Sequence, residues 1–461
     1  MRHYASSYHH QPVDFPEGQR AFQGSEVFSV GESPTVITWP DDATLAGHCA
    51  RLRVSVASDI REVVRLEVAS AETSVVFGDL DLRFSYPLQI HELFLDLRQT
   101  ELARGEGVAL RVAEGSGPQW LFWRGPGFEI GGHTPHLLRD GDPGSWETAL
   151  ERLMSLDALQ PFGWLEGCVL DGLSVWCDHP KYGEPCRAAI TRHLAMFADG
   201  AGELSYEDPR NVAVKSRLYG AEGGLPFAIL ARHSPQAPWL EIARTFFRAW
   251  SDSRSPWHVA ETSYTCAYPM AVLAALRGGE GWEQRAIDHL EGQSRVLTDS
   301  GGIWLRRSES GDRAEMKNWS RGIAWYLLGL ARSLPLLPKN LALEEAFRRT
   351  VFWVLGRQRT DGLWAVYVDE PGLTPDTSGC AGIAAAIAIG CRERLLPADC
   401  LPAAQATLAA LRNHLTPDGF LAGVAQSNKG GEGLQRSSHR VMAQFSLGLL
   451  ALLRRYAEDG D

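Results

Sequence analysis

The sequence predicts a multidomain protein, with an N-terminal β-sandwich followed by an all-α (α/α)6 barrel, a six-hairpin toroid. Three observations support this prediction. Apolar and polar residues alternate between residue 25 and about 130, a helical period of 3.6 replaces this alternation after about residue 145, and one turn motif recurs between the helices. We therefore expect a β-sandwich-like domain over residues 1–135 and a helical barrel over residues 145–461.

The β-sandwich is predicted from short stretches whose side chains alternate between apolar and polar types. This period of 2 is typical of strands with one buried face. Gly, Pro, Asp and Ser separate the stretches, as expected for turns. The clearest are ARLRVSVAS (50–58), VVRLEVAS (63–70), ELFLDLR (92–98) and GVALRVAE (107–114).

The helical part begins at SWETALERLMSLDAL, where Ser145 is a suitable cap and Glu147 lies in the first turn. About twelve helices fit the remaining length, including those near residues 150 and 165, with no convincing strand between them. The others are expected at 187–198, 222–233, 238–252, 265–277, 281–297, 321–334, 342–358, 378–394, 401–415 and 440–457.

A turn motif recurs in the connections between these helices. It appears in DGAGELSYED (199–208), DSGGIWLRRSE (299–309), TDGLWAVYVDE (360–370) and PDGFLAGVAQ (417–426). In each case a glycine ends a helix and a short extended stretch follows. The spacing fits a unit of about 50 to 60 residues, which is the length of a helical hairpin. Six hairpins would close into a barrel, and the alternative is an open solenoid.

Composition narrows the range of functions. The formal net charge is −11 and no basic block occurs, so we expect no nucleic-acid partner. No apolar run reaches about 20 residues and the N-terminus lacks an apolar signal core, so we expect no membrane span and a cytoplasmic location. The eight cysteines form no CxxC pair, so buried free thiols are expected rather than a metal site. The oligomeric state is left open.

The segment NWSRGIAW at residues 318–325 combines a predicted helix N-terminus with a cation and two indoles. Unpaired backbone N–H groups and the fork of Arg321 suit a carboxylate, while Trp319 and Trp325 offer flat faces for a sugar ring. The segment can therefore be interpreted as a uronic-acid subsite. The alternative is that both tryptophans are core residues and Arg321 pairs with an acidic side chain.

NWSRGIAWYLLGLARSLPLLP resembles the Trp-x-Arg-Gly-x-x-Trp segment of glycoside hydrolase families 88 and 105, the unsaturated glucuronyl and rhamnogalacturonyl hydrolases. A second similar segment is DGLWAVYVDEPGLTPDTSGCAGIAAAIAIG, which contains Trp364, Thr377 and Ser378. The resemblance covers roughly residues 145–457 and implies the same barrel fold. It also implies that Trp319, Arg321, Trp325, Trp364, Thr377 and Ser378 bind substrate, together with Trp304 of the GGIW turn.

The resemblance further implies a reaction on oligosaccharides that end in an unsaturated uronic acid. An acidic residue protonates the C4=C5 double bond, water adds at C5, the ring opens and the aglycone leaves. No metal or organic cofactor is implied. The acid must hold a proton near neutral pH, so it should lie partly desolvated in a cleft.

Glu222 and Glu261 are the candidate catalytic residues. Glu222 lies in LYGAEGGLPFAIL and Glu261 in WHVAETSYTCAYPMAVL, each just before a predicted helix. The families carry aspartates in these places, so the acidic motifs diverge here. Either glutamate could instead offset a helix dipole, worth about 0.3–1 kcal/mol. Asp171, Asp376 and Glu166 are further acidic candidates.

Two histidines and several N-terminal aromatic residues are weaker candidates. His258 lies three residues before Glu261 and is expected to contact substrate, and His439 precedes the last predicted helix. In the N-terminal region, GPQWLFWRGPGFEIGG contains three aromatic residues that could bind carbohydrate or pack against the barrel, and packing is the plainer option. These residues are Trp120, Trp123 and Phe128.

Four functions remain open from the sequence. The first is a glycoside hydrolase that removes a terminal, unsaturated uronic acid by acid-assisted hydration. The second is a hydrolase of saturated glucuronides on the same fold, which needs two carboxyls about 5–5.5 Å apart for retention or about 6.5–9.5 Å apart for inversion. The third is a sugar epimerase, which would need a pair of cleft histidines. The fourth is a carbohydrate-binding protein without catalysis.

Overall fold

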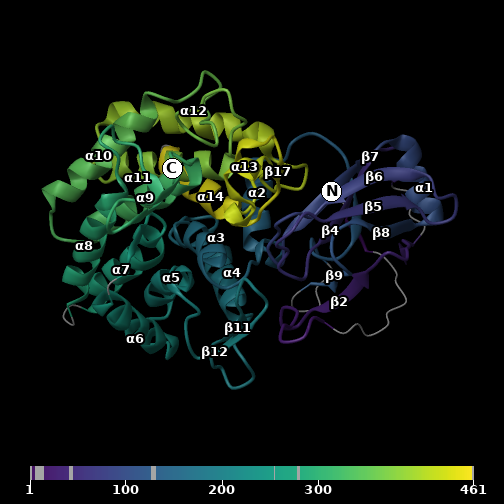
Figure 1. The fold of residues 1–461 in the computed structure, drawn as a ribbon, viewed down its shortest axis with the longest axis horizontal. Helices are drawn as coiled ribbons and strands as arrows, with labels where there is room; N and C mark the ends of the chain where they lie inside the picture. Colours follow the sequence, from purple (N-terminus) through teal and green to yellow (C-terminus); the bar gives the residue numbers. More distant parts are fainter. Residues whose placement is uncertain are drawn as a thin grey trace.

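The computed structural model describes residues 3–5, 15–40, 45–125, 131–253, 255–277 and 281–458. A β-rich region lies beside a larger region of helices that are arranged around a common centre (Figure 1). The predicted strands and helices fall in these two regions in the predicted order. Two parts with different sequence periods therefore form two structurally different regions.

Among its described residues, the β-rich region contains ten strands. They are β1 (His3–Ala5), β2 (Glu26–Val30), β3 (Thr35–Ile37), β4 (Ala50–Ser55), β5 (Arg65–Ser70), β6 (Val76–Asp81), β7 (Ile90–Leu95), β8 (Val108–Glu114), β9 (Gln119–Arg124) and β10 (His136–Arg139). Two antiparallel four-stranded sheets have the orders β1-β10-β4-β7 and β3-β8-β5-β6, and β2 pairs with β9. Strand β10 carries the region past the predicted limit at residue 135, to Arg139.

Apolar side chains from both four-stranded sheets share one buried cluster. Leu52 and Val54 enter it from β4, and Leu66, Val68 and Leu110 enter it from β5 and β8. Within the second sheet, Val68 lies opposite Leu110 in the antiparallel register. These are the apolar positions of the predicted alternation, so the period-2 pattern correctly identified the residues that face the core.

One helix of the β-rich region was not predicted. Residues Leu97–Glu106 form α1, although the sequence suggested a strand through residue 98. Asp96 ends the preceding strand and caps the helix: its side chain accepts from the backbone N–H of Gln99, and the Gln99 side chain accepts from the backbone N–H of Asp96. This reciprocal capping box is a local signal that outweighs the apolar alternation before it.

The second region contains α2 to α14. Their bounds are α2 (Trp146–Met154), α3 (Trp164–Ser174), α4 (Gly183–Ala195), α5 (Pro226–His233), α6 (Trp239–Asp252), α7 (Tyr268–Arg277), α8 (Trp282–Gln293), α9 (Ser320–Ser333), α10 (Leu341–Leu355), α11 (Thr377–Arg392), α12 (Leu401–Leu411), α13 (Gly431–Arg436) and α14 (Phe445–Ala457). Among the helices of the described residues, none combines the length and apolar character needed to cross a bilayer.

Short strands occur in the connections between helices, where the sequence suggested none. They are β11 (Ser205–Glu207), β12 (Ala213–Lys215), β13 (Trp257–Val259), β14 (Trp304–Ser308), β15 (Ala314–Lys317), β16 (Val424–Ala425) and β17 (Arg440–Val441). Most are two to four residues long. Such short pairs give too weak a periodicity to be recognised in a sequence.

Six helices contact one another in a closed cycle. Helix α3 packs against α5, α5 against α7, α7 against α9, α9 against α11, α11 against α14, and α14 again against α3. A second set lies outside them: α4, α6, α8 and α10 pack against α3, α5, α7 and α9 respectively, α12 packs against α11 and α14, and α2 packs against α14 and α3. Figure 1 shows the outer helices α6, α8, α10 and α12 at the periphery of this region.

The recurring turn motif has one backbone geometry in four connections. In each turn the N–H of one residue donates to the carbonyl four residues later: Asp199 to Glu203, Thr298 to Gly302, Arg359 to Leu363, and Thr416 to Phe420, at 2.7–2.9 Å. A glycine with positive φ lies inside each turn, namely Gly202, Gly301, Gly362 and Gly419. In the second turn this glycine is Gly301 rather than its neighbour Gly302, whose own role is close packing against Asn318.

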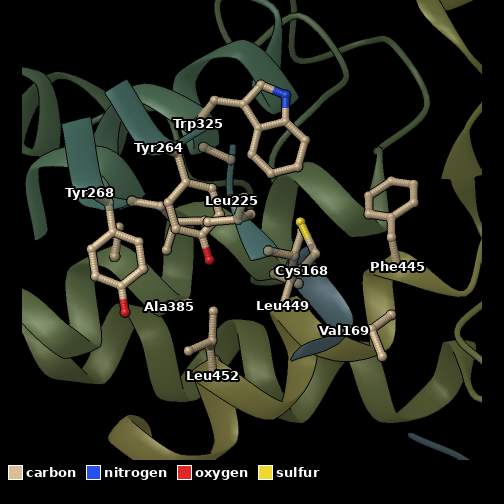
Figure 2. Packing of buried hydrophobic residues seen from close by; sticks show 14 of the residues in the cluster. Cys168, Val169, Leu225, Tyr264, Tyr268, Trp325, Ala385, Phe445, Leu449 and Leu452 are labelled. Carbon is tan, nitrogen blue, oxygen red and sulfur yellow. The ribbon is translucent and has the colours of Figure 1, made fainter. Parts of the chain in front are cut away.

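The centre of the helical cycle is filled with apolar side chains from several helices. Figure 2 shows Cys168 of α3, Trp325 of α9, and Phe445 and Leu449 of α14 in this cluster. Helices α3 and α14 approach closely at two glycines, because a Cβ on Gly172 would lie 2.4 Å from the Cα of Gly448. The cycle therefore closes through a contact that larger side chains would prevent.

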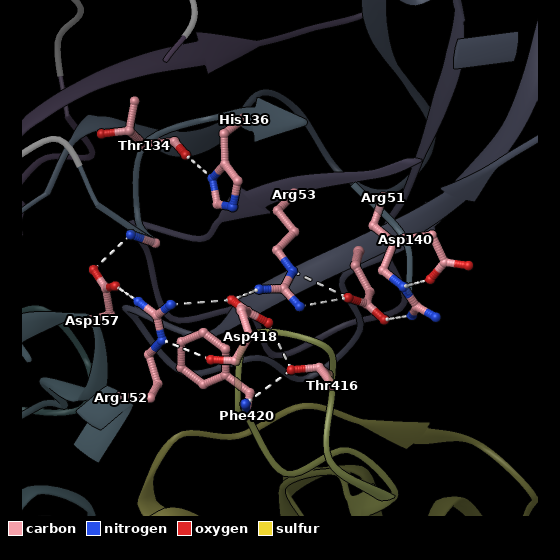
Figure 3. Close-up of polar contacts among 12 residues, drawn as sticks. Arg51, Arg53, Thr134, His136, Asp140, Arg152, Asp157, Thr416, Asp418 and Phe420 are labelled. Carbon is pink, nitrogen blue, oxygen red and sulfur yellow. Dashed lines mark hydrogen bonds and ion pairs between the residues drawn. The ribbon is translucent and has the colours of Figure 1, made fainter. Parts of the chain in front are cut away.

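Buried charges join the two regions (Figure 3). Arg53 of β4 is fully buried and pairs with Asp418, in the turn after α12, at 2.5 Å. Arg152 of α2 also contacts Asp418 at 3.5 Å and pairs with Asp157. Arg53 occupies a polar position of the predicted alternation, and the helical region covers the sheet face on which it lies.

Candidate functional site

Glu222 and Glu261 lie in adjacent turns at one end of the helical cycle. Glu222 is in a single 3-10 turn, Ala221–Gly223, that leads into α5. Glu261 follows β13 and precedes a π-helical turn, Ser263–Ala267, that leads into α7. Because α5 and α7 are neighbours in the cycle, the two turns also contact each other.

The local backbone explains why both turns adopt these positions. The carbonyl of Glu261 accepts from the N–H groups of Tyr264 and Thr265, each at 3.0 Å, which begins the π-helical turn. A Cβ on Gly224 would lie 2.2 Å from the carbonyl oxygen of Thr265, so only glycine permits this approach of the two turns. A π-helical turn is uncommon and often occurs at functional sites.

The carboxyl groups of Glu222 and Glu261 interact directly. Burial raises the pKa of Glu261 to about 8, and the negative charge and hydrogen bonding of Glu222 add to this rise. Two carboxyls in contact cannot both ionise at low cost, so one proton is retained between them at neutral pH. The pair thus provides an acid, Glu261, beside a second carboxyl group that can accept a proton.

Tyr219 and Arg306 extend the polar surroundings of this pair. The Tyr219 hydroxyl donates to Glu222 Oε2 at 3.5 Å. The positive charge of Arg306, on β14, partly offsets the rise in the pKa of Glu261. Among the described ranges, no carboxylate lies within 4 Å of the Arg306 guanidinium, so this cation is available to a ligand.

Aromatic side chains lie next to the glutamate turns. The ring of Trp164, at the start of α3, meets Trp325 edge-on with centroids 5.2 Å apart, and it meets Phe445 at 4.9 Å. Tyr264 stacks on Trp325 at 6.1 Å. Gly163 connects this group to the acidic pair, since a Cβ there would lie 2.6 Å from the Tyr219 hydroxyl. Trp164 is half-buried, so one indole remains accessible beside the glutamates.

The NWSRGIAW segment begins α9 as predicted, but its side chains are engaged within the protein. Trp319 is buried, and its Nε1–H donates to Gln435 at 3.1 Å. Arg321 donates to the carbonyl of Ala425 and to Ser378, and its Nε lies 3.5 Å from a carboxylate oxygen of Asp376. Arg321 is therefore engaged within the protein, by hydrogen bonds to Ala425 and Ser378 and by the nearby charge of Asp376.

The second family-like segment is also buried. The Trp364 side chain is fully buried, and its Nε1–H donates to the carbonyl of Val354 at 2.8 Å. The Thr377 hydroxyl donates to the carbonyl of Ala422, and the Ser378 hydroxyl donates to Asp376, the cap of α11. These contacts hold the start of α11 in place and direct no polar atom of the three residues toward the glutamate pair.

His258 lines a different cavity. This polar cavity of about 850 Å³ lies between α6, α8 and β13, and Glu222 and Glu261 are not in its lining. There His258 pairs with Glu309, and His289 contacts the Thr262 hydroxyl at 3.0 Å. Trp304, at the start of β14, is half-buried, with the Lys317 ammonium 5.6 Å from its ring centroid.

The remaining acidic candidates have structural partners. Glu166 is fully buried, and His193 contacts its carboxylate at 2.8 Å. Asp171, also fully buried, pairs with Arg332 at 2.5 Å and accepts from the Tyr264 hydroxyl at 2.5 Å. Both lie on α3 in the interior of the cycle, so neither shares the partly exposed position of the glutamate pair.

The other candidates belong to the β-rich region or its boundary. His439 lies 3.8 Å from a carboxylate oxygen of Asp81, where the two regions meet. Trp123 packs in the β-rich core, and Trp120 meets Phe15 edge-on while packing against the helical core. These contacts agree with a packing role for both tryptophans. Phe128 lies outside the described residues.

Sequence reasoning missed several residues around the glutamate pair. Tyr219 and Arg306 lie inside the quoted motifs LYGAEGGLPFAIL and DSGGIWLRRSE, and Trp164 lies two residues before Glu166, but none was singled out as a ligand. Tyr86 of the β-rich region also reaches this neighbourhood and lies in no motif. Within the residues that the structure describes, no group of three or more His, Cys, Asp and Glu side chains is arranged to hold a metal ion.

Sequence comparison relates part of the chain to a known family. Residues 246–456 match the sequence model of the family described as Glycosyl Hydrolase Family 88. Two curated proteins are similar, each 29% identical over 135 residues: Protein Atu3128 of Agrobacterium fabrum and the 24.9 kDa protein in the picA locus of Rhizobium radiobacter. Each alignment includes 25% of this chain and 58% of the relative.

Solved structures share the fold at low sequence identity. A possible member of family 105 from Klebsiella pneumoniae is 17% identical, with a TM-score of 0.56, over 64% of this chain and 82% of that chain. A family 105 glycoside hydrolase from C. acetobutylicum is 18% identical, with a TM-score of 0.56, over 68% and 97%. A family 88 glycosyl hydrolase from Bacteroides vulgatus is 16% identical, with a TM-score of 0.53, over 68% and 97%. The sequence match over residues 246–456 and the shared fold agree with the resemblance of the motifs to glycoside hydrolase families 88 and 105.

Proposed function

We propose that this protein is a glycoside hydrolase that removes a terminal unsaturated uronic acid from oligosaccharides by acid-assisted hydration. We also propose that residues 145–461 form an (α/α)6 barrel and that residues 1–135, extended by β10, form a β-sandwich domain. The observation that carries the proposed reaction is the contact between Glu222 and Glu261, with the pKa of Glu261 raised to about 8. The relationship to family 88 supports the same class of reaction.

In the proposed reaction, the protonated carboxyl of Glu261 gives its proton to C4 of the C4=C5 double bond. A water molecule adds to C5 and gives a proton to the carboxylate of Glu222. The product is a hemiketal at C5, which opens the ring to a ketone and frees the anomeric carbon to release the aglycone. Each glutamate changes its protonation state once, and the pair returns to its starting state by exchange with solvent.

The separation of the carboxyls favours hydration over hydrolysis of a saturated glucuronide. Two carboxyls that touch are closer than the 5–5.5 Å or 6.5–9.5 Å typical of retaining and inverting glycosidases. Contact instead suits a reaction in which one carboxyl donates a proton and its neighbour accepts one. The saturated-glucuronide activity is therefore the second candidate.

Arg306 supports a substrate with a carboxylate. A guanidinium group without a partner carboxylate can bind such a group with two parallel hydrogen bonds. We propose Arg306, rather than Arg321, as the main partner of the uronate, because Asp376 already compensates Arg321. Trp164 supplies an accessible aromatic face for the sugar ring, and the edge-on contact with Trp325 holds the Trp164 ring in position.

The test follows absorbance near 235 nm while the purified protein acts on oligosaccharides made by polysaccharide lyases. The absorbance should fall as the double bond is hydrated, and Glu222→Gln or Glu261→Gln should reduce kcat by at least about 100-fold. Glu345→Gln is the matched control, because Glu345 is exposed on the outer helix α10. A constant absorbance with all lyase products, together with release of an aryl group from saturated glucuronides, would establish the second candidate instead.

A further inference from the structure

A loop of the β-rich region reaches the glutamate pair. Residues 82–89 connect β6 to β7, and Tyr86 lies at the centre of this loop. Its ring meets the ring of Trp164 edge-on, with centroids 6.1 Å apart. Tyr86 is half-buried, and with Arg321 and Ser427 it lines a small cavity of about 10 Å³ at the start of the helical region.

Three donors from residues 426–444 fasten this loop to the helical region. The Gln426 side chain donates to the carbonyl of Arg83 at 2.9 Å, and the Gln444 side chain donates to the carbonyl of Leu88 at 2.6 Å. Between them, the Lys429 ammonium donates to the carbonyl of Ser85 at 3.1 Å and pairs with Asp59. The attachments lie on both sides of Tyr86 and restrict its position.

The backbone on both sides of Tyr86 adopts unfavourable conformations. Phe84 has φ 54° and Leu88 has φ 68°, in the left-handed region that bulky side chains rarely adopt. Such conformations persist only where surrounding contacts impose them, and they are frequent at functional sites. The three attachments supply that constraint, so the loop is held in a shape that projects Tyr86 toward Trp164.

The environment of Tyr86 keeps its hydroxyl protonated, beside the Ser427 side chain with which it is hydrogen-bonded. The Lys429 ammonium lies 4.1 Å from the ring centroid and covers the ring. Burial, together with the negative charge of Glu222, raises the pKa of Tyr86, so the hydroxyl keeps its proton across the physiological range. Trp164 connects Tyr86 to the acidic pair, because the preceding residue, Gly163, packs against Tyr219 and Glu222.

We propose that the β-rich region completes the candidate site and that Tyr86 contacts the bound uronic acid through its hydroxyl group. The ring of Tyr86 forms a wall at right angles to Trp164, and its hydroxyl donates to an oxygen of the sugar beside Glu222. The N-terminal region then has a role in substrate binding in addition to packing against the barrel. This inference rests on the proposed function.

Two variants test it. Tyr86→Phe keeps the ring against Trp164 and Lys429 but removes the hydroxyl, and Tyr86→Ala removes the wall as well. Loss of one hydrogen bond should raise KM for the unsaturated oligosaccharide about 5-fold in Tyr86→Phe, with a smaller change in kcat and an unchanged Tm. Tyr86→Ala should raise KM further. Tyr182→Phe is the matched control, because Tyr182 is half-buried against Trp176, which follows the end of α3 opposite to Trp164, and it should keep the wild-type KM.

A direct binding measurement separates this inference from the proposed function. Isothermal titration calorimetry compares two inactive proteins, Glu261→Gln alone and the double variant Glu261→Gln with Tyr86→Phe. The double variant should bind an intact unsaturated disaccharide about 5-fold more weakly. If the wild-type protein hydrates the double bond but Tyr86→Phe keeps the wild-type KM and affinity, the role of Tyr86 is wrong and the proposed function stands. If the wild-type protein neither hydrates nor binds any lyase product, both are wrong.

Discussion

Glu261 is subject to two opposing electrostatic influences. Burial and the neighbouring Glu222 favour its protonated form, whereas the positive charge of Arg306 favours its ionised form. The first influence is larger, so the pKa lies at about 8, well above the ordinary value of 4.5. A side chain that holds a proton at neutral pH inside a partly exposed turn has the property that general acid catalysis requires.

The raised pKa of Glu261 predicts how stability varies with pH. In the unfolded chain this carboxyl ionises near pH 4.5, while in the folded protein it stays protonated up to about pH 8. The folded state therefore binds more protons in this window, and its stability falls as pH rises from 4.5 to 8. Glu261→Gln removes the ionisable group, so the variant should gain Tm relative to wild type as pH increases.

Thermal unfolding of both proteins at pH 5, 7 and 9 checks this expectation. The Tm difference should be small at pH 5 and should reach about 2 °C or more in favour of Glu261→Gln at pH 9. Glu345→Gln, at an exposed position of the outer helix α10, should show the same pH profile as wild type. A Tm difference for Glu261→Gln that does not vary with pH would contradict the raised pKa.

Replacing Arg306 should change both the KM and the pH dependence of the reaction. Arg306→Met should raise KM for a uronate substrate by about 10-fold or more, because a charge-assisted pair is lost. It should also raise the pKa of Glu261, since the cation that lowers it is removed, so the alkaline limb of kcat/KM should move to higher pH.

Arg307→Met is the control for this pair of measurements. Arg307 follows Arg306 on β14, so its side chain emerges on the opposite face, where it donates to the carbonyl of Arg295. Wild-type KM and an unchanged pH profile are expected for this variant. Equal effects of the two substitutions would show that β14 matters for folding rather than for carboxylate binding.

At the scale of elements, close approach between helices depends on glycine. Helices α3 and α14 meet where a Cβ on Gly448 would lie 1.9 Å from the carbonyl oxygen of Cys168. Because this atom belongs to the backbone of α3, no side-chain movement can relieve the overlap. The contact also closes the cycle of inner helices, since α3 and α14 are its first and last members.

Gly448→Ala should therefore destabilise the protein by about 3 kcal/mol, at the upper end of the usual range for overpacking. Gly292→Ala on α8 is the matched control, because nothing lies within 4 Å of a Cβ at that position. Alanine favours a helix over glycine there and should stabilise by about 0.5–1 kcal/mol. Urea unfolding measures both changes, and a neutral Gly448→Ala would exclude the proposed tight contact.

At the scale of the whole molecule, one buried ion-pair network connects the β-rich region to the helices. Asp418 lies between Arg53 of β4 and Arg152 of α2 (Figure 3). Arg53 is fully buried, so its charge depends on Asp418 and Glu92 for compensation. Removing a partner from such a network leaves a desolvated charge with too few acceptors.

Asp418→Asn should lower the free energy of unfolding by about 3 kcal/mol. Asp140→Asn is the matched control, because Asp140 pairs with Arg51 at 2.7 Å in a partly exposed position and should contribute about 1 kcal/mol or less. Differential scanning calorimetry of the two variants measures the contrast. Equal, small effects would show that the two regions are held together by apolar packing alone.

Much of the architecture was predictable from local patterns. Alternation identified Leu52, Val54 and Val68 as core positions, and the recurring glycine turn identified hairpins whose connections share one backbone hydrogen bond. The helix Leu97–Glu106 was missed because the capping box between Asp96 and Gln99 outweighs the alternation of the neighbouring strand. The short strands between helices were missed because two to five residues carry too little periodicity.

The candidate site was predictable only in part. Glu222 and Glu261 could be chosen because each precedes a helix in a motif, and the structure brings them into contact. Arg321 was chosen for its fork-shaped side chain, but its charge is compensated by Asp376, which lies 55 residues later in the chain. Tyr86 gave no sequence signal, because its relation to Trp164 arises from packing between two regions.

The sequence by itself therefore determined the two regions, the positions of most helices, the repeat and the resemblance to family 88. These properties depend on side-chain periodicity and on short motifs, which act over a few residues. Only the tertiary structure decided which acidic groups share a proton, which cation stays available and which loop reaches the acidic pair. Those properties depend on burial and on distances between side chains far apart in the chain, and neither quantity is encoded in a local pattern.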